Sequence, residues 1–176
     1  MKKAVPIILF LALLSCQRAQ EPSSPAPLLI SSDQQLFMLI TQQQPFAGYR
    51  LFPNADSVVS GTLNGSNAHQ PVVRVVMNPM GISALPEGRA PDGLSFPDGS
   101  VILKEIRIDG AASLYAVMYK ERNNPLSSGG WLWAEFKPDG AVVFSIQKMG
   151  DGCISCHARE QGPQHDHVRT FERQNR

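Results

Sequence analysis

From residue 72 onward, the chain alternates short apolar runs with turn residues. Runs rich in β-branched and aromatic side chains, separated by glycine, proline, asparagine and aspartate, predict strands. They cover residues 72–77, 100–108, 113–120, 131–136 and 141–147. Between the second and third runs, Asp109-Gly110 predicts a tight hairpin turn. We therefore expect an α+β fold, mainly β, with an antiparallel sheet of about five strands and one or two helices packed on it.

A stretch with helical periodicity precedes these runs, at residues 32–44. Ser32 and Gln35 have the spacing of a capping box, which marks the start of a helix. Three apolar side chains share one helical face: Leu36, Leu39 and Ile40. Pro45 is expected to end the helix because proline has no backbone N–H to donate.

The first residues have the pattern of an export signal. Two lysines precede an apolar run at residues 4–14, which is shorter than the roughly 20 residues needed to span a bilayer and fits a secretory signal. Residues 13–16 (LLSC) then resemble the bacterial lipobox, in which the cysteine is lipidated and becomes the first residue. The alternative is an ordinary signal peptide that is cut nearby, with Cys16 left unmodified.

These patterns predict three segments. Residues 1–15 form a lipoprotein signal peptide, residues 16–28 a lipidated tether rich in proline and serine, and residues 29–176 a single domain. We expect a periplasmic protein that is anchored to a membrane through lipid on Cys16. Gln17 is not the aspartate that often retains lipoproteins at the inner membrane, which favours the outer membrane. The net charge of +1 gives no indication of a nucleic-acid partner.

Candidate chemistry centres on residues 153–157, Cys-Ile-Ser-Cys-His. Two cysteines three positions apart, followed at once by a histidine, are typical of c-type haem attachment. The thiols of Cys153 and Cys156 would add to the haem vinyl groups, and His157 would bind the iron. The alternative is a redox or zinc Cys-x-x-Cys pair, although zinc needs further ligands. Of the three cysteines in the chain, one is then lipidated and two bind haem.

Two basic residues interrupt apolar strand patterns. Side chains at positions 102, 104, 106 and 108 share one strand face, so Lys104 lies among three isoleucines. It either extends along its stem to solvent or points into a buried pocket, where its pKa would fall. Arg74 raises the same question between Val72 and Val76, and would pair with an anion or a carboxylate there.

The position of the haem motif restricts the kind of cytochrome. The last methionine, Met149, precedes the motif, so a downstream methionine ligand is excluded. After His157 the imidazoles are those of His165 and His167. A C-terminal motif with an open distal side is similar to the cytochromes c-prime, but the common members are four-helix bundles, which the strand pattern does not fit.

The sequence resembles the cytochrome P-460 family, which includes the β-sheet cytochromes called c-prime-beta. The segments that carry the resemblance are residues 73–79 (VRVVMNP), 96–105 (FPDGSVILKE), 130–134 (GWLWA), 153–157 (CISCH) and 166–171 (DHVRTF). They occur in the family's order and cover most of the chain from about residue 72 onward. The resemblance implies a haem c cofactor and oxidation of hydroxylamine, with nitric oxide as an intermediate or ligand.

The resemblance also implies roles for individual residues. The lysine that P-460 members join covalently to a haem meso carbon falls on Lys104. Members of the c-prime-beta group lack this bond and crowd the distal side with phenylalanine, a part that Phe96 could play unless it belongs to the core. The family's strand arginine, near the distal pocket, falls on Arg74.

Two departures from the family pattern concern the base that accepts protons. The family's carboxylate before the haem cysteines falls on Gly150, with Asp151 adjacent. Another acidic position, close to residue 166, is His165 here. Asp151 and His165 are therefore the candidate bases. The alternatives to hydroxylamine oxidation are nitric oxide binding without turnover and plain periplasmic electron transfer. An electron-accepting cytochrome is implied as partner, and the resemblance also implies a homodimer.

Overall fold

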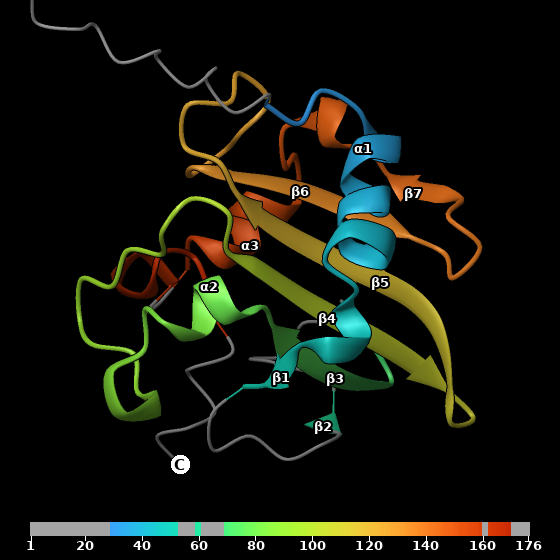
Figure 1. Cartoon of the computed structure of the whole chain (residues 1–176), viewed down its shortest axis with the longest axis horizontal. Coiled ribbons are helices and arrows are strands. Elements are labelled where there is room, and N and C mark those ends of the chain that lie inside the picture. Colours follow the sequence, from blue (N-terminus) through green and yellow to red (C-terminus); the bar gives the residue numbers. More distant parts are fainter. Residues whose placement is uncertain (1–28, 53–58, 61–68, 160–161, 170–176) are drawn as a thin grey trace, which may run out of the picture.

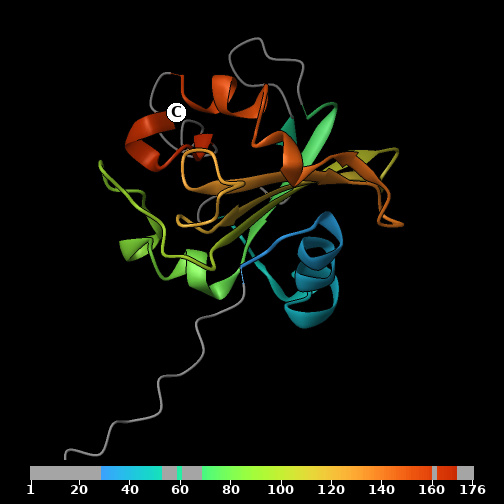
Figure 2. The same ribbon diagram turned by 90° about the horizontal axis from the view of Figure 1, so that it is seen from above.

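The computed structural model describes residues 29–52, 59–60, 69–159 and 162–169. They form a seven-stranded antiparallel sheet with helices on both faces (Figure 1 and Figure 2). The strands are β1 (Arg50–Leu51), β2 (Val59–Ser60), β3 (Val72–Met77), β4 (Val101–Ile108), β5 (Ala111–Lys120), β6 (Trp131–Phe136) and β7 (Val142–Phe144). Their order is β1-β3-β4-β5-β6-β7, and β2 also pairs with β3. The predicted signal peptide and tether, with Cys16, lie outside the described residues.

The predicted mainly β fold is confirmed, and all five predicted strands are found. The turn between β4 and β5 has positive φ at both Asp109 (50°) and Gly110 (81°), as a tight hairpin turn of the primed type requires. Two further short strands, β1 and β2, were not predicted, because two residues are too few to show alternation.

The last predicted strand, residues 141–147, is too long. β7 ends at Phe144 because Ser145 caps a 3-10 helix, η4 (Ile146–Lys148), by accepting a hydrogen bond from the backbone N–H of Gln147. Asp33 accepts hydrogen bonds from the hydroxyl of Ser145 and the N–H of Ile146, at 2.7 and 2.8 Å. The start of α1 (Asp33–Met38) therefore holds the end of the sheet.

The predicted helix at residues 32–44 forms as α1 followed by one π-helical segment, η1 (Leu39–Gln43). Ser32 caps it by accepting a hydrogen bond from the N–H of Gln35 at 3.2 Å. The side chain of Gln35 accepts a hydrogen bond from the N–H of Ser31 rather than from that of Ser32. The second hydrogen bond of the capping box is therefore made to the residue before the cap. The predicted apolar face is buried.

The remaining helices are short. They are η2 (Phe46–Gly48), α2 (Pro79–Ile82), η3 (Pro86–Gly88), α3 (Cys153–His157) and η5 (Gly162–His165). In the described part of the chain, no helix has the length and apolar character to cross a membrane. In Figure 2, α1 lies on one side of the sheet and α3 on the other.

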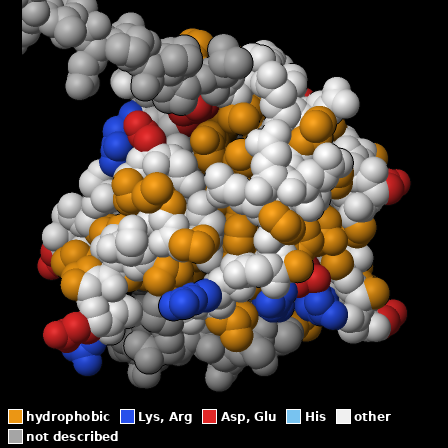
Figure 3. Space-filling view, in the orientation of Figure 1, with side chains coloured by type: hydrophobic (Ala, Val, Ile, Leu, Met, Phe, Trp, Pro, Cys, Tyr) orange, Lys and Arg blue, Asp and Glu red, His pale blue; other side chains and the backbone are white. Residues whose placement is uncertain are grey.

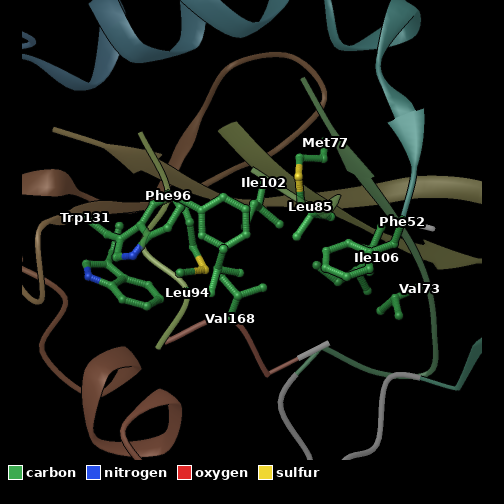
Figure 4. Close-up of a cluster of buried hydrophobic side chains, with 13 residues drawn as sticks. Phe52, Val73, Met77, Leu85, Leu94, Phe96, Ile102, Ile106, Trp131 and Val168 are labelled. Carbon is green, nitrogen blue, oxygen red and sulfur yellow. The ribbon is translucent and has the colours of Figure 1, made fainter. Parts of the chain in front are cut away.

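The sheet therefore has two buried faces, each with its own apolar cluster. We call the first the α1 face; it includes Leu36, Ile40, Val76, Leu103 and Leu132. We call the second the motif face; it includes Val73, Val75, Ile102, Ile106 and Trp133, with Cys153 and Ile154 packed against it. Figure 4 shows the motif face, where Phe52 and Val73 lie at one end of the cluster and Trp131 at the other. The α1 face is the side seen in Figure 3, where basic side chains gather toward the lower edge.

The isoleucines around Lys104 follow the predicted alternation only in part. Ile102 and Ile106 are buried on the motif face. Ile108 is 50% exposed, because the register between β4 and β5 shifts between Ile106 and Arg107. The apolar surroundings of Lys104 on its own strand are therefore two isoleucines, not three.

Candidate functional site

Both cysteines of the motif lie on the single turn of α3, where a spacing of three positions puts them on the same side of the helix. Both thiols are free and partly buried. The chain enters α3 through a turn at residues 150–152, in which Gly150 and Gly152 have φ of 72° and 80°. Cys153 packs against the motif-face cluster, and the sulfur of Cys156 accepts a hydrogen bond from Nη1 of Arg169 at 3.4 Å. Two thiols on one side of a helical turn fit a group attached at two points.

Position 150 requires glycine for two reasons, the nearby side chain of Trp133 and the positive backbone angle φ. A Cβ atom there would lie 2.5 Å from Cδ1 of Trp133, and its positive φ disfavours other residues. A side chain at this position would displace the indole that packs beside the motif. A carboxylate side chain, which the resemblance implies at position 150, therefore has no room there.

The imidazole of His157 is oriented for binding a metal ion. Its Nδ1 lies 2.7 Å from the carbonyl oxygen of His167, so Nδ1 carries the proton and donates it. Nε2 is then the nitrogen with the free electron pair, as in most metal-binding histidines. The ring packs edge-on against Trp133, with 4.8 Å between ring centroids. Burial, and next the charge of Lys104, lowers the pKa of His157 to about 4, so the ring is neutral at neutral pH.

The carbonyl that holds His157 belongs to a segment anchored by Asp166. The Asp166 carboxylate accepts hydrogen bonds from the ammonium of Lys120 at 2.7 Å and from the N–H of Phe96 at 2.8 Å. Its backbone oxygen accepts a third from the indole of Trp131 at 2.8 Å. Because His167 follows directly, this anchor determines where its carbonyl meets His157.

The same segment is held at its other end. Val168 is buried in the motif-face cluster, and Nη1 of Arg169 donates to the backbone oxygen of Cys156 at 3.1 Å. The chain after α3 thus returns to contact the motif itself. This contact gives residues 166–168 (Asp-His-Val) a structural role, which their neighbours in the sequence do not explain.

Lys104 lies on the motif face, opposite Val75 of β3 and Ala116 of β5. It is partly buried, and its charge acts on both His157 and His69. The strand face of Lys104 is therefore the predicted one, while the direction of its side chain stays a prediction.

The predicted position of Arg74 near the distal pocket is wrong. Arg74 pairs with Glu105 across β3 and β4, with 3.3 Å between Nη1 and Oε2, and Glu105 also binds Arg107 at 2.7 Å. Successive strand residues point to opposite faces, so Arg74 lies on the α1 face while its neighbour Val75 lies on the motif face. Arg74 therefore has the carboxylate partner that the sequence predicted. This ion pair joins β3 to β4 on the α1 face.

Phe96 is fully buried in the motif-face cluster, in edge-on contact with Trp131 at 5.6 Å between centroids. Figure 4 shows it between Trp131 and Ile102. Its N–H donates to Asp166. Of the two parts considered for Phe96, the structure supports membership of the core at the Trp131 end of the cluster.

The two candidate bases lie in different places. Asp151 is exposed in the turn before α3, where its charge acts on Cys153. His165 is buried at the end of η5, and its Nε2 lies 3.9 Å from a carboxylate oxygen of Asp92. Neither is a residue of the sheet's motif face, and their role as bases stays a prediction.

Two further titratable residues at the site were missed by the sequence reasoning. Glu135 lies opposite Ala116, in phase with Trp131 and Trp133. Burial raises its pKa, and its charge acts on Cys153. Alternation along residues 131–135 would have identified it. The second is His69, which precedes β3 in a stretch without periodicity, so no local signal marks it.

The residues present fit a covalently bound haem. The donor set consists of two free thiols, one neutral imidazole with Nε2 available, and an apolar face. Within the described residues, the buried Nδ1 atoms of His69 and His167 have no hydrogen-bond partner, as expected where a further group belongs. No cluster of three or more His, Cys, Asp or Glu side chains that could hold a metal ion is found among these residues, and haem iron needs no such cluster.

Comparison with known proteins agrees with this site. A family model described as Cytochrome P460 matches residues 48–170, which is more than half of the chain. No curated protein matches the chain. The matched region includes β3 to β7 and α3, and with them Lys104 and the haem-attachment motif.

Proposed function

Because this chain belongs to the cytochrome P460 family, and is therefore a haem c protein, we propose that it oxidises hydroxylamine, with nitric oxide as an intermediate or ligand. The haem would be held by Cys153 and Cys156, with His157 as the ligand to its iron. When bound, the haem supplies the iron at which the substrate binds and the redox chemistry. The polypeptide controls access, orientation and charge.

The observation that carries the proposal is the position of Lys104. It lies on the motif face, and its charge reaches His157. We propose that its Nζ is joined to a meso carbon of the haem, as in the P-460 members that the sequence resembles. Such a nitrogen is uncharged at working pH, so the apolar motif face would not have to accommodate an ammonium charge at this position.

The residues of the chain would assist as follows. The Asp166 segment orients His157 and keeps its Nδ1 protonated through the His167 carbonyl. The apolar motif face excludes bulk water and so strengthens charge interactions at the site. Oxidation of hydroxylamine removes protons as well as electrons, so a base must lie within reach of the substrate nitrogen. Asp151 and His165 are the proposed acceptors.

A second candidate function is nitric oxide binding without turnover. It is favoured by the contact between Gly150 and Trp133, which leaves no room for the carboxylate that assists hydroxylamine oxidation in the family. Capture of a neutral diatomic ligand needs no base, so this function would tolerate the loss. Electron transfer alone is a third reading that the absence of a methionine after His157 disfavours.

The test combines a spectrum, a digest and an activity measurement. A cross-linked haem shifts the ferrous Soret band strongly to the red of ordinary haem c, and the Lys104 peptide should travel with the Cys153 and Cys156 peptide in mass spectrometry. Lys104→Ala should separate the peptides and restore the ordinary spectrum, while the exposed Lys137→Ala should change neither. Hydroxylamine-dependent reduction of a dye should accompany the cross-link. If the wild-type peptides separate, nitric oxide binding replaces hydroxylamine oxidation.

We also propose that the protein is periplasmic, anchored through lipid on Cys16, and that it passes electrons to another cytochrome. The support is the lipobox-like segment at residues 13–16 and the export that haem c maturation requires. Expressed in a bacterium, the protein should partition with membranes, and Cys16→Ser should release it or leave it unprocessed. A fully soluble wild-type protein that begins after Cys16 would disprove the anchor.

A further inference from the structure

His69 lies within electrostatic reach of Lys104 and His157 on the motif face. It precedes β3, with a left-handed φ of 61° that turns the chain before the strand begins. His157 packs against Trp133 of β6. In the order of the sheet, β4 and β5 lie between β3 and β6, so the two imidazoles approach the motif face from different ends.

Lys104 of β4 lies within electrostatic reach of both imidazoles. Its charge acts on the imidazoles of both His69 and His157, and that of His157 also acts on His69. Val73 of β3, close to His69 in the chain, marks the end of the apolar cluster farthest from Trp131 in Figure 4. A group held at α3 and bordered by Lys104 would therefore have His69 near it as well as His157.

The surroundings of His69 keep its ring neutral. In the haem-free protein burial, and next the charge of Lys104, lowers its pKa to about 3, and burial, the larger cause, does not depend on the charge of Lys104. A neutral imidazole offers one N–H donor and one acceptor nitrogen. Its Nδ1 is buried and has no hydrogen-bond partner among the described residues. Buried polar atoms without partners are rare in folded proteins, so this nitrogen is open to a hydrogen-bond partner that the described residues do not supply.

His157 and His69 differ in the hydrogen bond that the Nδ1 atom makes, and this difference distinguishes an iron ligand from a residue that only lies near the iron. A metal-binding histidine almost always donates its second ring N–H to a carbonyl, a carboxylate or water. His157 does so, to His167. For the Nδ1 of His69 the described residues offer no such acceptor. This nitrogen is therefore available to a ligand rather than committed to orienting the ring for coordination.

We propose that His69 is the distal histidine of this protein, which faces the haem from the side opposite His157 and donates a hydrogen bond to a small nitrogenous ligand at the iron. The inference rests on the proposed haem site and adds the residue that recognises the ligand. It applies equally to hydroxylamine and to nitric oxide, because both present electron pairs to an N–H donor.

The experiment uses the holoprotein and nitric oxide as the probe. The ferrous nitric oxide complex of wild type should show an N–O stretching frequency that shifts in D₂O. His69→Leu removes the donor, so this frequency should rise and nitric oxide should dissociate about three- to tenfold faster, as expected for the loss of one neutral hydrogen bond. His69→Gln keeps an N–H donor and should restore most of both properties.

Three outcomes would count against the inference, each in a different way. If nitric oxide binds but its stretching frequency is insensitive to D₂O and to His69→Leu, His69 makes no hydrogen bond and the proposed function stands alone. If resting wild type is six-coordinate and low-spin, and His69→Leu converts it to high-spin, His69 is an iron ligand instead. If wild type binds no nitric oxide, the proposed function fails and the inference with it. Should His69→Leu not fold, the D₂O measurement on wild type still decides.

Discussion

The ammonium of Lys120 lies 2.7 Å from the carboxylate of Asp166, with side-chain exposures of 2% and 11%. Lys120 also lies over the ring of Trp131, 4.8 Å from its centroid. Burial lowers the pKa of Lys120, while the bond to Asp166 opposes that shift. The pair joins the end of β5 to the segment that orients His157, so its geometry bears on the haem ligand as well as on the fold.

Breaking this pair should be costly. Asp166→Asn in the holoprotein should lower the free energy of unfolding by about 3–5 kcal/mol, because it leaves a buried ammonium uncompensated. The double variant with Lys120→Met should recover part of that loss. Chemical denaturation measures both. The exposed pair of Arg122 and Asp98 is the matched control, for which Asp98→Asn should lose less than about 1 kcal/mol. Equal losses at the two pairs would contradict the prediction.

Substitutions at Gly150 and at Gly152 can distinguish the cost of a steric contact from the cost of backbone strain. Both have positive φ, but a Cβ at Gly150 meets Trp133, whereas a Cβ at Gly152 meets nothing within 4 Å. Gly152→Ala should therefore lose about 1 kcal/mol from strain alone. Gly150→Ala should lose a further 1–3 kcal/mol or so because the indole must move. Denaturation of both variants, with haem content measured, tests this, and equal losses would refute the steric argument.

Glu135 should suppress ionisation of a haem-attaching thiol. Burial, and next the charge of Glu135, raises the pKa of Cys153 to about 11. In haem-free protein, Glu135→Gln removes a negative charge beside the thiol, so the pKa of Cys153 should fall. Alkylation at pH 8, followed at the Cys153 peptide by mass spectrometry, should become roughly two- to fivefold faster. The exposed Glu87→Gln is the control, and an unchanged rate in Glu135→Gln would contradict the prediction.

The haem-free protein should lose stability in mild acid. Burial lowers the pKa of His157 to about 4 and that of His69 to about 3, from 6.5 in the unfolded chain. Below pH 6.5 the unfolded state then binds more protons than the folded state, so stability falls as pH falls from about 6.5 through 4. The loss by pH 4 should be roughly 3 kcal/mol for each histidine at most, and less to the extent that solvent reaches the rings. A variant with both histidines changed to Gln should lack this part of the pH dependence. A slope equal to that of wild type would show that other groups cause it.

Local pattern was enough to predict much of this protein. The alternation of apolar side chains located β3 to β6, and Asp109-Gly110 located the hairpin between β4 and β5. Spacing alone identified Cys153, Cys156 and His157, because three residues on one helical turn need no distant contact to be recognised. The same alternation assigned Lys104 to the face on which the structure shows it.

Tertiary structure decided what depends on contacts between distant segments. Arg74 was expected near the distal pocket, but pairing of β3 with β4 places it beside Glu105 on the α1 face. The resemblance marked residues 166–171 but gave no partner for Asp166; its partners lie 46 residues away at Lys120 and 70 residues away at Phe96.

The physical reason is the range of the forces involved. Strand alternation and helix capping act over a few residues, so their signals are written in neighbouring positions. Other features depend on burial and on residues that meet only when the sheet has formed. They are the orientation of His157, the steric contact with Trp133 that excludes a side chain at Gly150, and the position of His69 near the site. For that reason the sequence by itself determined strands β3 to β6 and the attachment motif, whereas the tertiary structure decided which polar residues surround that motif.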